Sequence, residues 1–179
     1  GASDGRLGVA VIDLNNASTT ARKAWFLFED EMVALGAGIT SAHANPVRTA
    51  LNQCLLKGPV TADGATLARG RRTLPAAHWV HHDGVGYVLP AKGPVSLENN
   101  ARTGSWQRVH QSVSPTPLSR DIFTLWLEHG TRPNDESYSY IVVPKASASE
   151  VASYAASSPI RVLVNTEALQ GVRHDPMRA

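Results

Sequence analysis

The chain has 179 residues, 17 Lys and Arg against 15 Asp and Glu, a formal net charge of +2 and 42% apolar residues. Ordinary apolar content with a small net charge excludes an intrinsically disordered chain, and a single cysteine, Cys54, excludes a disulfide scaffold. Two excess positive charges argue against a strong nucleic-acid binder. No apolar run approaches the roughly 20 residues that a membrane-spanning helix needs.

Short runs rich in Val, Ile and aromatic residues alternate with Gly, Pro, Asn and Asp, which predicts a chain made mostly of β-strands. The first part contains four expected strands: Leu7–Leu14, Arg22–Glu29, Met32–Thr40 and Val47–Leu56. The acidic residues 29–31 form the expected turn between the second and third strands. Gly36 and Gly38 inside the third strand indicate a bulge or a close backbone approach.

The middle of the chain begins with a polar stretch, Gly58–Pro75, that contains several turn signals. Two short strands then flank Asp83-Gly84, whose residues tolerate the positive φ angles of a type I′ hairpin turn. Pro90 and Pro94 predict a further turn. The strands expected in this part are Trp79–His82, Val85–Leu89, Val95–Ala101 and Trp106–Gln111.

The last part combines four more expected strands with one helix. Ser147 and Glu150 have capping-box spacing, the alanine-rich Val151–Ala156 follows them, and Pro159 ends the helix. The strands are Ile122–His129, Tyr138–Val143, Ile160–Asn165 and Leu169–Arg173. About a dozen strands and one helix indicate a large antiparallel sandwich, and the same number also suits a barrel. The sequence leaves that choice open.

The densest group of titratable residues is His81-His82-Asp83 with the nearby His78. Histidines on a strand are able to ligate a metal ion, but neighbouring residues of a strand point to opposite faces of its sheet. No Cys or carboxylate stands at a familiar ligand spacing from them. The sequence therefore favours structural or surface histidines, and it predicts no metal site.

No motif of a familiar active site is present. The chain has no Gly-x-Ser-x-Gly and no phosphate loop, and residues 36–38 lack the third glycine of a dinucleotide fingerprint. Cys54 lies in an apolar strand and is predicted to be a small buried side chain. Glycoside hydrolysis needs two carboxylates across a cleft, but nothing in the sequence brings Glu98, Glu128 or Glu136 together. These glutamates are predicted to be solvated.

Two groups of residues suit a carbohydrate polymer. Arg69, Arg71 and Arg72 are able to contact a polyanion, although a solvated loop is the simpler interpretation. Tryptophan rings stack on sugars, but apolar neighbours favour core packing for at least three of the four tryptophans. These are Trp25, Trp79, Trp106 and Trp126.

An ordered set of segments resembles a known family. The segments are Lys23–Thr40, Asn45–Thr49, Trp79–Leu89, Gly104–Trp106 and Leu125–Val143. From about Leu7 to Arg173 the chain is similar to the family 8 polysaccharide lyases, namely the hyaluronate, chondroitin AC and xanthan lyases. The resemblance implies an all-β fold, a large antiparallel β-sandwich (supersandwich, galactose-mutarotase-like) with one short helix. It implies a supersandwich portion at 1–144, and a short helix with the start of a C-terminal β-domain at 145–179.

The resemblance also implies a function. These lyases are secreted, and they cleave uronic-acid-containing polysaccharide by β-elimination, in which a base removes the C5 proton and the oxygen at C4 leaves. Their catalytic Asn, His, Tyr and Arg come from an N-terminal α/α-toroid, and a supporting Glu comes from an early stretch of the central β-domain. We expect neither region in this chain. The resemblance carries no catalytic residue onto it, because the residues that match belong to strand motifs: His81, His82, Tyr87, Tyr138 and Tyr140.

We therefore expect a non-catalytic β-domain that packs against a toroid in an extracellular lyase. Its polysaccharide is of the hyaluronan, chondroitin or xanthan type, and the sequence does not choose among them. The substrate-binding residues stay unknown, and no cofactor, nucleic acid or membrane span is expected. The alternative is a stand-alone carbohydrate-binding or structural β-sandwich module.

Overall fold

The computed structural model describes residues 1–16 and 18–175, and most of them lie in β-strands. Two helical segments accompany the strands, α1 (Ala148–Ala156) and the single 3₁₀ turn η1 (Trp106–Arg108). The strands are β1 (Ala2–Ser3), β2 (Gly8–Asn16), β3 (Thr19–Leu27), β4 (Met32–Ser41), β5 (Pro46–Leu55), β6 (Val60–Ala62), β7 (Ala65–Leu67), β8 (Gly70–His82), β9 (Val85–Gly104), β10 (Leu118–Thr131), β11 (Glu136–Pro144), β12 (Ile160–Asn165) and β13 (Gln170–His174).

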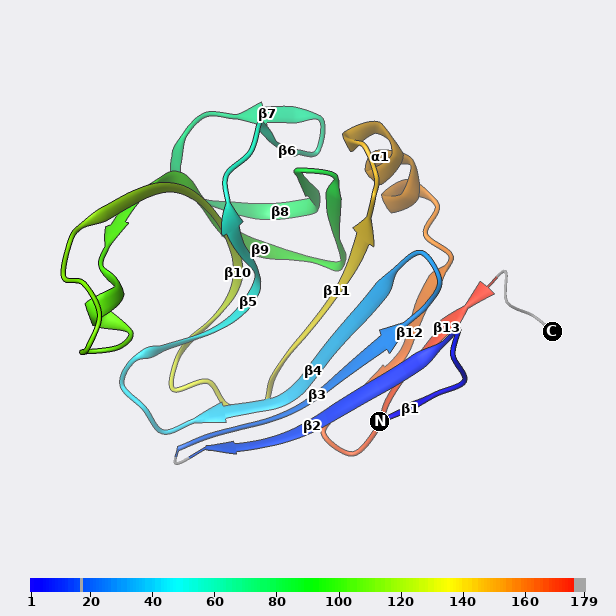
Figure 1. Ribbon diagram of the computed structural model, residues 1–179. Coiled ribbons are helices and arrows are strands. Elements are labelled where there is room, and N and C mark those ends of the chain that lie inside the picture. The colour runs from blue at the N-terminus through cyan, green and yellow to red at the C-terminus, as the bar shows by residue number, and fades with distance from the viewer. Residues whose placement is uncertain (17, 176–179) are drawn as a thin grey trace.

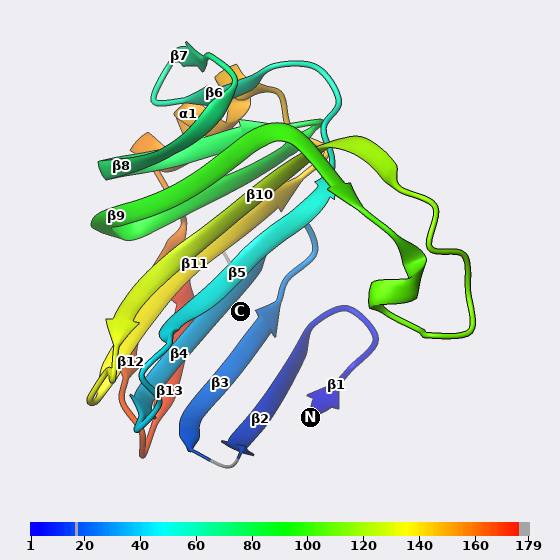
Figure 2. The ribbon, with the colours of Figure 1, turned by 90° about the vertical axis from the view of Figure 1, so that its left-hand side faces the viewer.

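Within the described residues, eleven strands form one antiparallel sheet in the order β1-β2-β3-β4-β11-β9-β8-β6-β7, with β10 beside β9 and β5 beside β10. The sheet curves over on itself, so that β2, β3 and β4 lie in a lower layer while β5, β8, β9 and β10 lie in an upper layer (Figure 1; Figure 2 shows the same curvature from the side). The all-β sandwich that the sequence predicts is confirmed, and the strand order leaves the sheet open rather than closed into a barrel.

β9 belongs to both layers. Its first residues, Val85–Val88, pair with β11, and its later residues, Ser96–Gly104, pair with β10. β8 accompanies it on the other edge, with register shifts around Ala77. The turn expected at Pro90 and Pro94 is therefore wrong: both prolines lie inside one continuous strand. Proline has no N–H for the ladder, so it is tolerated at the place where the pairing with β8 is irregular.

Two apolar clusters hold the layers. The first lies between them and joins residues from both, among them Ala34, Tyr138, Leu97, Phe123 and Leu125. The second lies on the opposite face of the sheet, where Val33, Leu35 and Ile141 pack beneath β12 while Trp79 and Val88 pack beneath α1. Residues of β4 alternate between the two clusters, as side chains of a strand with both faces covered must.

The β12–β13 hairpin is a separate two-stranded sheet that lies against the large one. The side-chain amide of Asn165 donates to the backbone carbonyls of Gly36 and Tyr138, at 3.1 and 2.9 Å. One side chain of the hairpin thus bonds to two neighbouring strands, β4 and β11. Among the residues described, no helix has the length and apolar character that a membrane span requires.

The capping box that the sequence predicts is present at the start of α1. Ser147 Oγ accepts from the backbone N–H of Glu150 at 3.3 Å, and Glu150 Oε2 accepts from the backbone N–H of Ser147 at 2.7 Å. Two helix-end donors are thereby satisfied, which fixes the point where the chain leaves β11 and begins to cover the sheet.

Removing this cap has a measurable cost. We expect Ser147→Ala to lower the free energy of unfolding by about 1 kcal/mol, because an orphan N–H of the first turn loses its acceptor. Urea denaturation checks the value. Ser112→Ala, in the exposed loop after η1, serves as a control, and an equal effect of both substitutions would refute the role of the cap.

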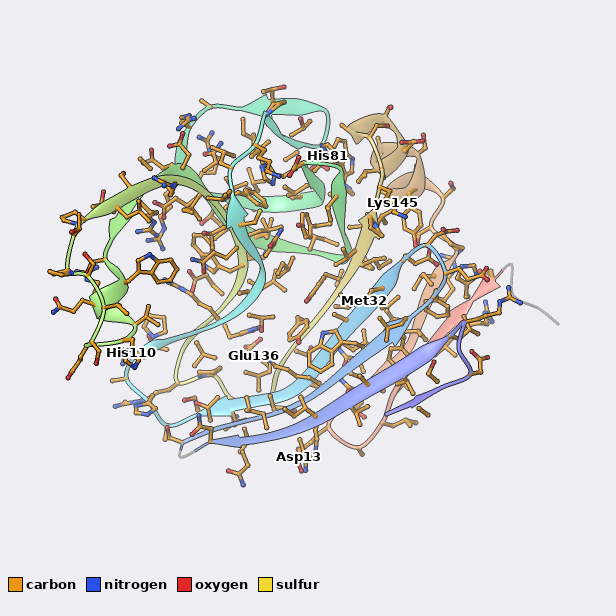
Figure 3. The ribbon with its side chains drawn as sticks, viewed as in Figure 1. Asp13, Met32, His81, His110, Glu136 and Lys145 are labelled. Carbon is orange, nitrogen blue, oxygen red and sulfur yellow. The ribbon has the colours of Figure 1, made fainter. Side chains whose placement is uncertain are left out.

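Two expectations from the sequence are wrong in detail. The expected strand Trp106–Gln111 is a 3₁₀ turn followed by a loop, and this segment projects from the sheet, as the position of His110 shows (Figure 3). None of the described strands lies beside it to complete a ladder. Conversely, the polar stretch Gly58–Pro75 contains β6, β7 and the beginning of β8. The other expected strands and the Asp83-Gly84 turn, with φ of 47° and 75°, are confirmed.

Candidate functional site

The outward face of the upper layer carries a group of side chains that the sequence scatters over 80 residues. Along β10, Trp126 and Glu128 point to this face, away from the core residues Leu125 and Phe123. β5 places Arg48 directly opposite Glu128, and β8 contributes Arg71. We refer to Arg48, Arg71, Trp126 and Glu128 as the Trp126 cluster.

Two guanidinium groups cover the indole of this cluster. The Cζ atoms of Arg48 and Arg71 lie 5.5 and 5.2 Å from the centroid of the Trp126 ring. Both distances are within the range of cation–π attraction. As a result Trp126 is only 5% exposed, although it faces outward and belongs to neither apolar cluster.

The carboxylate of Glu128 lies close to the other three side chains of the cluster. Arg48 Nε lies 3.0 Å from both carboxylate oxygens, the indole N–H of Trp126 donates to Oε1 at 2.6 Å, and Arg71 lies 4.0 Å from the same oxygen. Partial burial by itself raises the pKa of Glu128, but the hydrogen bonds from Trp126 and Arg48 and the charges of both arginines outweigh it. The pKa therefore lies below its ordinary value, and the carboxylate is ionised at neutral pH.

The chemistry of this arrangement is recognition rather than proton transfer. A carboxylate with a lowered pKa is a weak base, and guanidinium groups stay protonated at any ordinary pH. Guanidinium forks, an indole N–H and an aromatic ring are, however, the groups that bind carboxylates, sulfates and sugar rings.

The three arginines that the sequence singles out do not act together. Only Arg71 joins the Trp126 cluster. Arg69 pairs with Asp121 at 2.7 Å, and Arg72 donates to the backbone carbonyls of Ala68 and Arg69. Arg48 was not expected at all, because its place depends on the register of β5 against β10.

The histidines lie in three different surroundings. His82 is 1% exposed, and its Nε2 accepts from the backbone N–H of Lys57 at 3.1 Å. His81 points to the other face, where its Nε2 lies 2.9 Å from the carbonyl oxygen of Ala146, close to the entry into α1 (Figure 3). His78 contacts Asp63, with 3.5 Å between Nδ1 and Oδ2. In the part of the chain that the structure describes, no three metal-ligating side chains come together.

Cys54 is half-buried beside the first apolar cluster, as the sequence predicts. Its Sγ lies 3.5 Å from the amide nitrogen of Asn52 and 3.7 Å from Nδ1 of His82. Burial raises the pKa of the Cys54 thiol, and the charge of Asp83 raises it further. Burial also lowers the pKa of His82, so this histidine is neutral and does not stabilise a thiolate.

We therefore expect Cys54 to be a slow nucleophile. At pH 8 the folded chain should react with a disulfide reagent at least about tenfold more slowly than the urea-unfolded chain, since a raised pKa and burial both reduce accessible thiolate. Absorbance of the released thiol measures both rates. Equal rates in the two states would contradict the assignment.

The other candidates from the sequence are distributed over the molecule. Core packing is confirmed for Trp79 and for the half-buried Trp25, whereas Trp106 is 63% exposed on η1. Glu98 was predicted to be solvated, but its side chain is only 13% exposed and it accepts from Arg102 at 2.8 Å. Glu136 begins β11, where it is exposed opposite Ile39, as predicted. Glu128, predicted to be solvated, is instead bound within the Trp126 cluster.

Comparison with known proteins now decides the family. Residues 1–155 match the family model described as polysaccharide lyase family 8, super-sandwich domain. The chain belongs to polysaccharide lyase family 8.

Relatives of this family 8 chain cover nearly all of it. It is 39% identical to the chondroitinase-AC of Pedobacter heparinus over 99% of its length, and 35% identical to the xanthan lyase of Bacillus sp. (strain GL1) over 94%. A solved structure of chondroitinase AC lyase superposes with a TM-score of 0.92 and 38% identity, covering 97% of this chain and 26% of that one. The chain spans only 26% and 20% of the two curated relatives.

Proposed function

We propose that this family 8 chain is the super-sandwich part of a secreted lyase that cleaves uronic-acid-containing polysaccharide by β-elimination. The observation that carries the proposal is the likeness over nearly the full chain to a chondroitinase and a xanthan lyase. The polysaccharide is then of the hyaluronan, chondroitin or xanthan type. Because the chain spans only 26% and 20% of these relatives, we assign the reacting groups to other parts of the whole protein.

The chemistry of the described side chains supports the proposal that the reacting groups lie outside this chain. β-Elimination needs a base, a group that neutralises the uronate carboxylate and a proton donor, all within one cleft. The tyrosines are poorly suited to give or take a proton: burial raises the pKa of Tyr87 to about 12 and raises that of Tyr138 as well. His82 is buried and bonded to the backbone. We propose that this chain is scaffold and binding surface rather than catalyst.

We further propose the domain arrangement expected from the resemblance. Residues 1–144 form the super-sandwich portion, and residues 145–179 begin the next β-domain, of which 176–179 lie outside the described residues. The separate β12–β13 sheet supports a change of domain in this region. The family match continues to residue 155 and thus includes most of α1. In the whole protein the super-sandwich packs against an N-terminal helical toroid.

The experiment compares the whole encoded protein with this chain. Each is incubated with hyaluronan, chondroitin sulfate or xanthan, and the ultraviolet absorbance of unsaturated uronyl ends is followed. We expect product from the whole protein on at least one polymer and none from the chain alone. Elimination by the isolated chain would place the reacting groups inside it, and no elimination by the whole protein on any uronate polymer would reject the lyase assignment.

A further inference from the structure

Two more arginines lie on the outward face of the upper layer, beyond the Trp126 cluster. Arg120 of β10 lies directly opposite Arg102 of β9. Arg102 forms an ion pair with Glu98 at 2.8 Å. Arg120 donates only to the carbonyl oxygen of its neighbour Ser119, and no carboxylate among the described residues lies within ion-pair distance of it.

The facing side chains of Arg102 and Arg120 repel each other when nothing is bound to this face. Like charges that face each other across two strands destabilise a sheet. Among the side chains that the structure describes, the face holds Arg48, Arg71, Arg102 and Arg120 against Glu98 and Glu128, an excess of two positive charges. From Glu128 to Arg120 the strand advances eight residues, which is about 26 Å. An extended polyanion along β10 would relieve this excess charge.

At the Trp126 cluster, the contacts of Glu128 indicate which chemical group this end of the face binds. Its carboxylate receives the Nε–H of Arg48 and the indole N–H of Trp126, with Arg71 at 4.0 Å, directly beside an aromatic ring. These contacts are those that a sugar carboxylate or sulfate requires. Arg48 and Arg71 are 46% and 57% exposed, so an anion from solvent reaches both of them.

We propose that the outward face of β5, β8, β9 and β10 binds an anionic polysaccharide that runs along β10. A carboxylate or sulfate of the polymer takes the place of Glu128 between Arg48 and Arg71, the guanidinium groups move with it, and a sugar ring gains contact with Trp126. The choice of polymer rests on the proposed function. The binding itself involves no bond-breaking step and is independent of the catalytic groups.

The test uses this chain with three octasaccharides: hyaluronan, chondroitin 4-sulfate and the neutral maltooctaose. Calorimetry and tryptophan fluorescence report the affinity. We expect both anionic sugars to bind, more weakly as salt increases, and the neutral sugar not to bind. Arg71→Gln and Arg48→Gln should each weaken binding about tenfold, as expected for the loss of one charged hydrogen bond. Glu128→Gln should tighten binding about threefold, since it removes a competing carboxylate.

Arg161→Gln is the matched control, because Arg161 is an exposed arginine of β12 in an ion pair with Asp175. It should leave the affinity unchanged, and thermal melting verifies that every variant is folded. Binding of the neutral sugar with equal affinity, an equal loss in the control, or no binding would overturn the inference. The inference would also be overturned if Arg71→Gln did not change the affinity of the full-length protein, because another part of the protein would then cover this face.

The lyase assay separates the two proposals. Elimination by the whole protein without sugar binding by this chain refutes the binding face alone. Binding by the chain without elimination by the whole protein leaves the face intact and refutes the proposed reaction.

Discussion

Replacing Gly36 with alanine should lower the free energy of unfolding by about 3 kcal/mol, at the upper end of what overpacking costs. A Cβ atom at this position would lie 2.1 Å from Cε1 and 2.5 Å from Cζ of Tyr138, far inside van der Waals contact. The two residues face each other across β4 and β11. Tyr138 is 7% exposed and stacks on Tyr140 with 5.8 Å between ring centroids, so its ring has no room to retreat.

Urea denaturation followed by tryptophan fluorescence measures this loss. Gly104→Ala is the matched control, because Gly104 also lies in a strand but a Cβ there would meet nothing within 4 Å. We expect little change in the control. Similar free energies for the two variants would show that the contact between Gly36 and Tyr138 is less tight than the structure has it.

His174→Ala should destabilise the chain by about 3 kcal/mol at pH 7, because it leaves a buried carboxylate without its partner. His174, at the end of β13, has its Nε2 2.8 Å from Oε1 of Glu31, and these side chains are only 14% and 6% exposed. The ring also packs on Phe28, with 5.1 Å between centroids. The pair holds the β12–β13 hairpin to the turn between β3 and β4.

The pH dependence distinguishes charge from lost packing. Burial raises the pKa of Glu31 above its ordinary value of 4.5 even beside His174, and Asp30 raises it further. The folded chain thus binds this proton more tightly than the unfolded chain, so the free energy of unfolding falls as the pH rises through that interval. Without His174 the pKa rises more. The loss in His174→Ala should therefore be smaller at pH 5 than at pH 7.

Two further variants complete this measurement. Glu31→Gln should cost little or even stabilise the chain, because it removes the buried charge and keeps the shape of the side chain. Arg173→Ala, which breaks only an exposed pair with Asp175, should change the free energy of unfolding by less than about 1 kcal/mol. A pH-independent loss in His174→Ala would mean that packing on Phe28, and not the contact with the Glu31 carboxylate, supports the hairpin.

The sequence predicts those parts of the fold that depend on neighbouring residues. Asp83-Gly84 forms its tight turn because both residues accept positive φ, and Ser147 caps α1 because its bonds reach only to Glu150. Apolar runs such as β4 and β11 are visible because both of their faces are covered. The bulge that the sequence allows is present beside Gly38, where the pairing of β3 with β4 shifts register. At Gly36 the close neighbour is the ring of Tyr138, and not the backbone that the sequence indicates.

The misassigned segments depend on partners that are distant in sequence. β8 begins with a polar outward face, so Arg71 and Thr73 hide its strand character, and pairing with β9 makes it a strand. Trp106 and Val109 stand among polar residues, and this segment pairs with none of the described strands, so it forms a 3₁₀ turn followed by a loop. Sequence patterns report burial, but they do not say which strand lies alongside.

The Trp126 cluster was hidden for the same reason. Arg48 and Glu128 are 80 residues apart, and they meet only because β5 contains a register shift opposite Leu125 and Trp126. Arg71, Trp126 and Glu128 each stand out in the sequence, but for three separate reasons. Their common location requires the order β5-β10-β9-β8, which no local pattern contains.

The shared strand β9 has a consequence for how the chain reaches this structure. Since β9 pairs with β8, β10 and β11, neither layer is complete until residues from both halves of the sequence have met. Such distant strands lose the entropy of closing long loops before stabilising contacts form. Proteins with this kind of topology fold on a scale of milliseconds to seconds. We expect a slow, single cooperative transition in which the two layers assemble together.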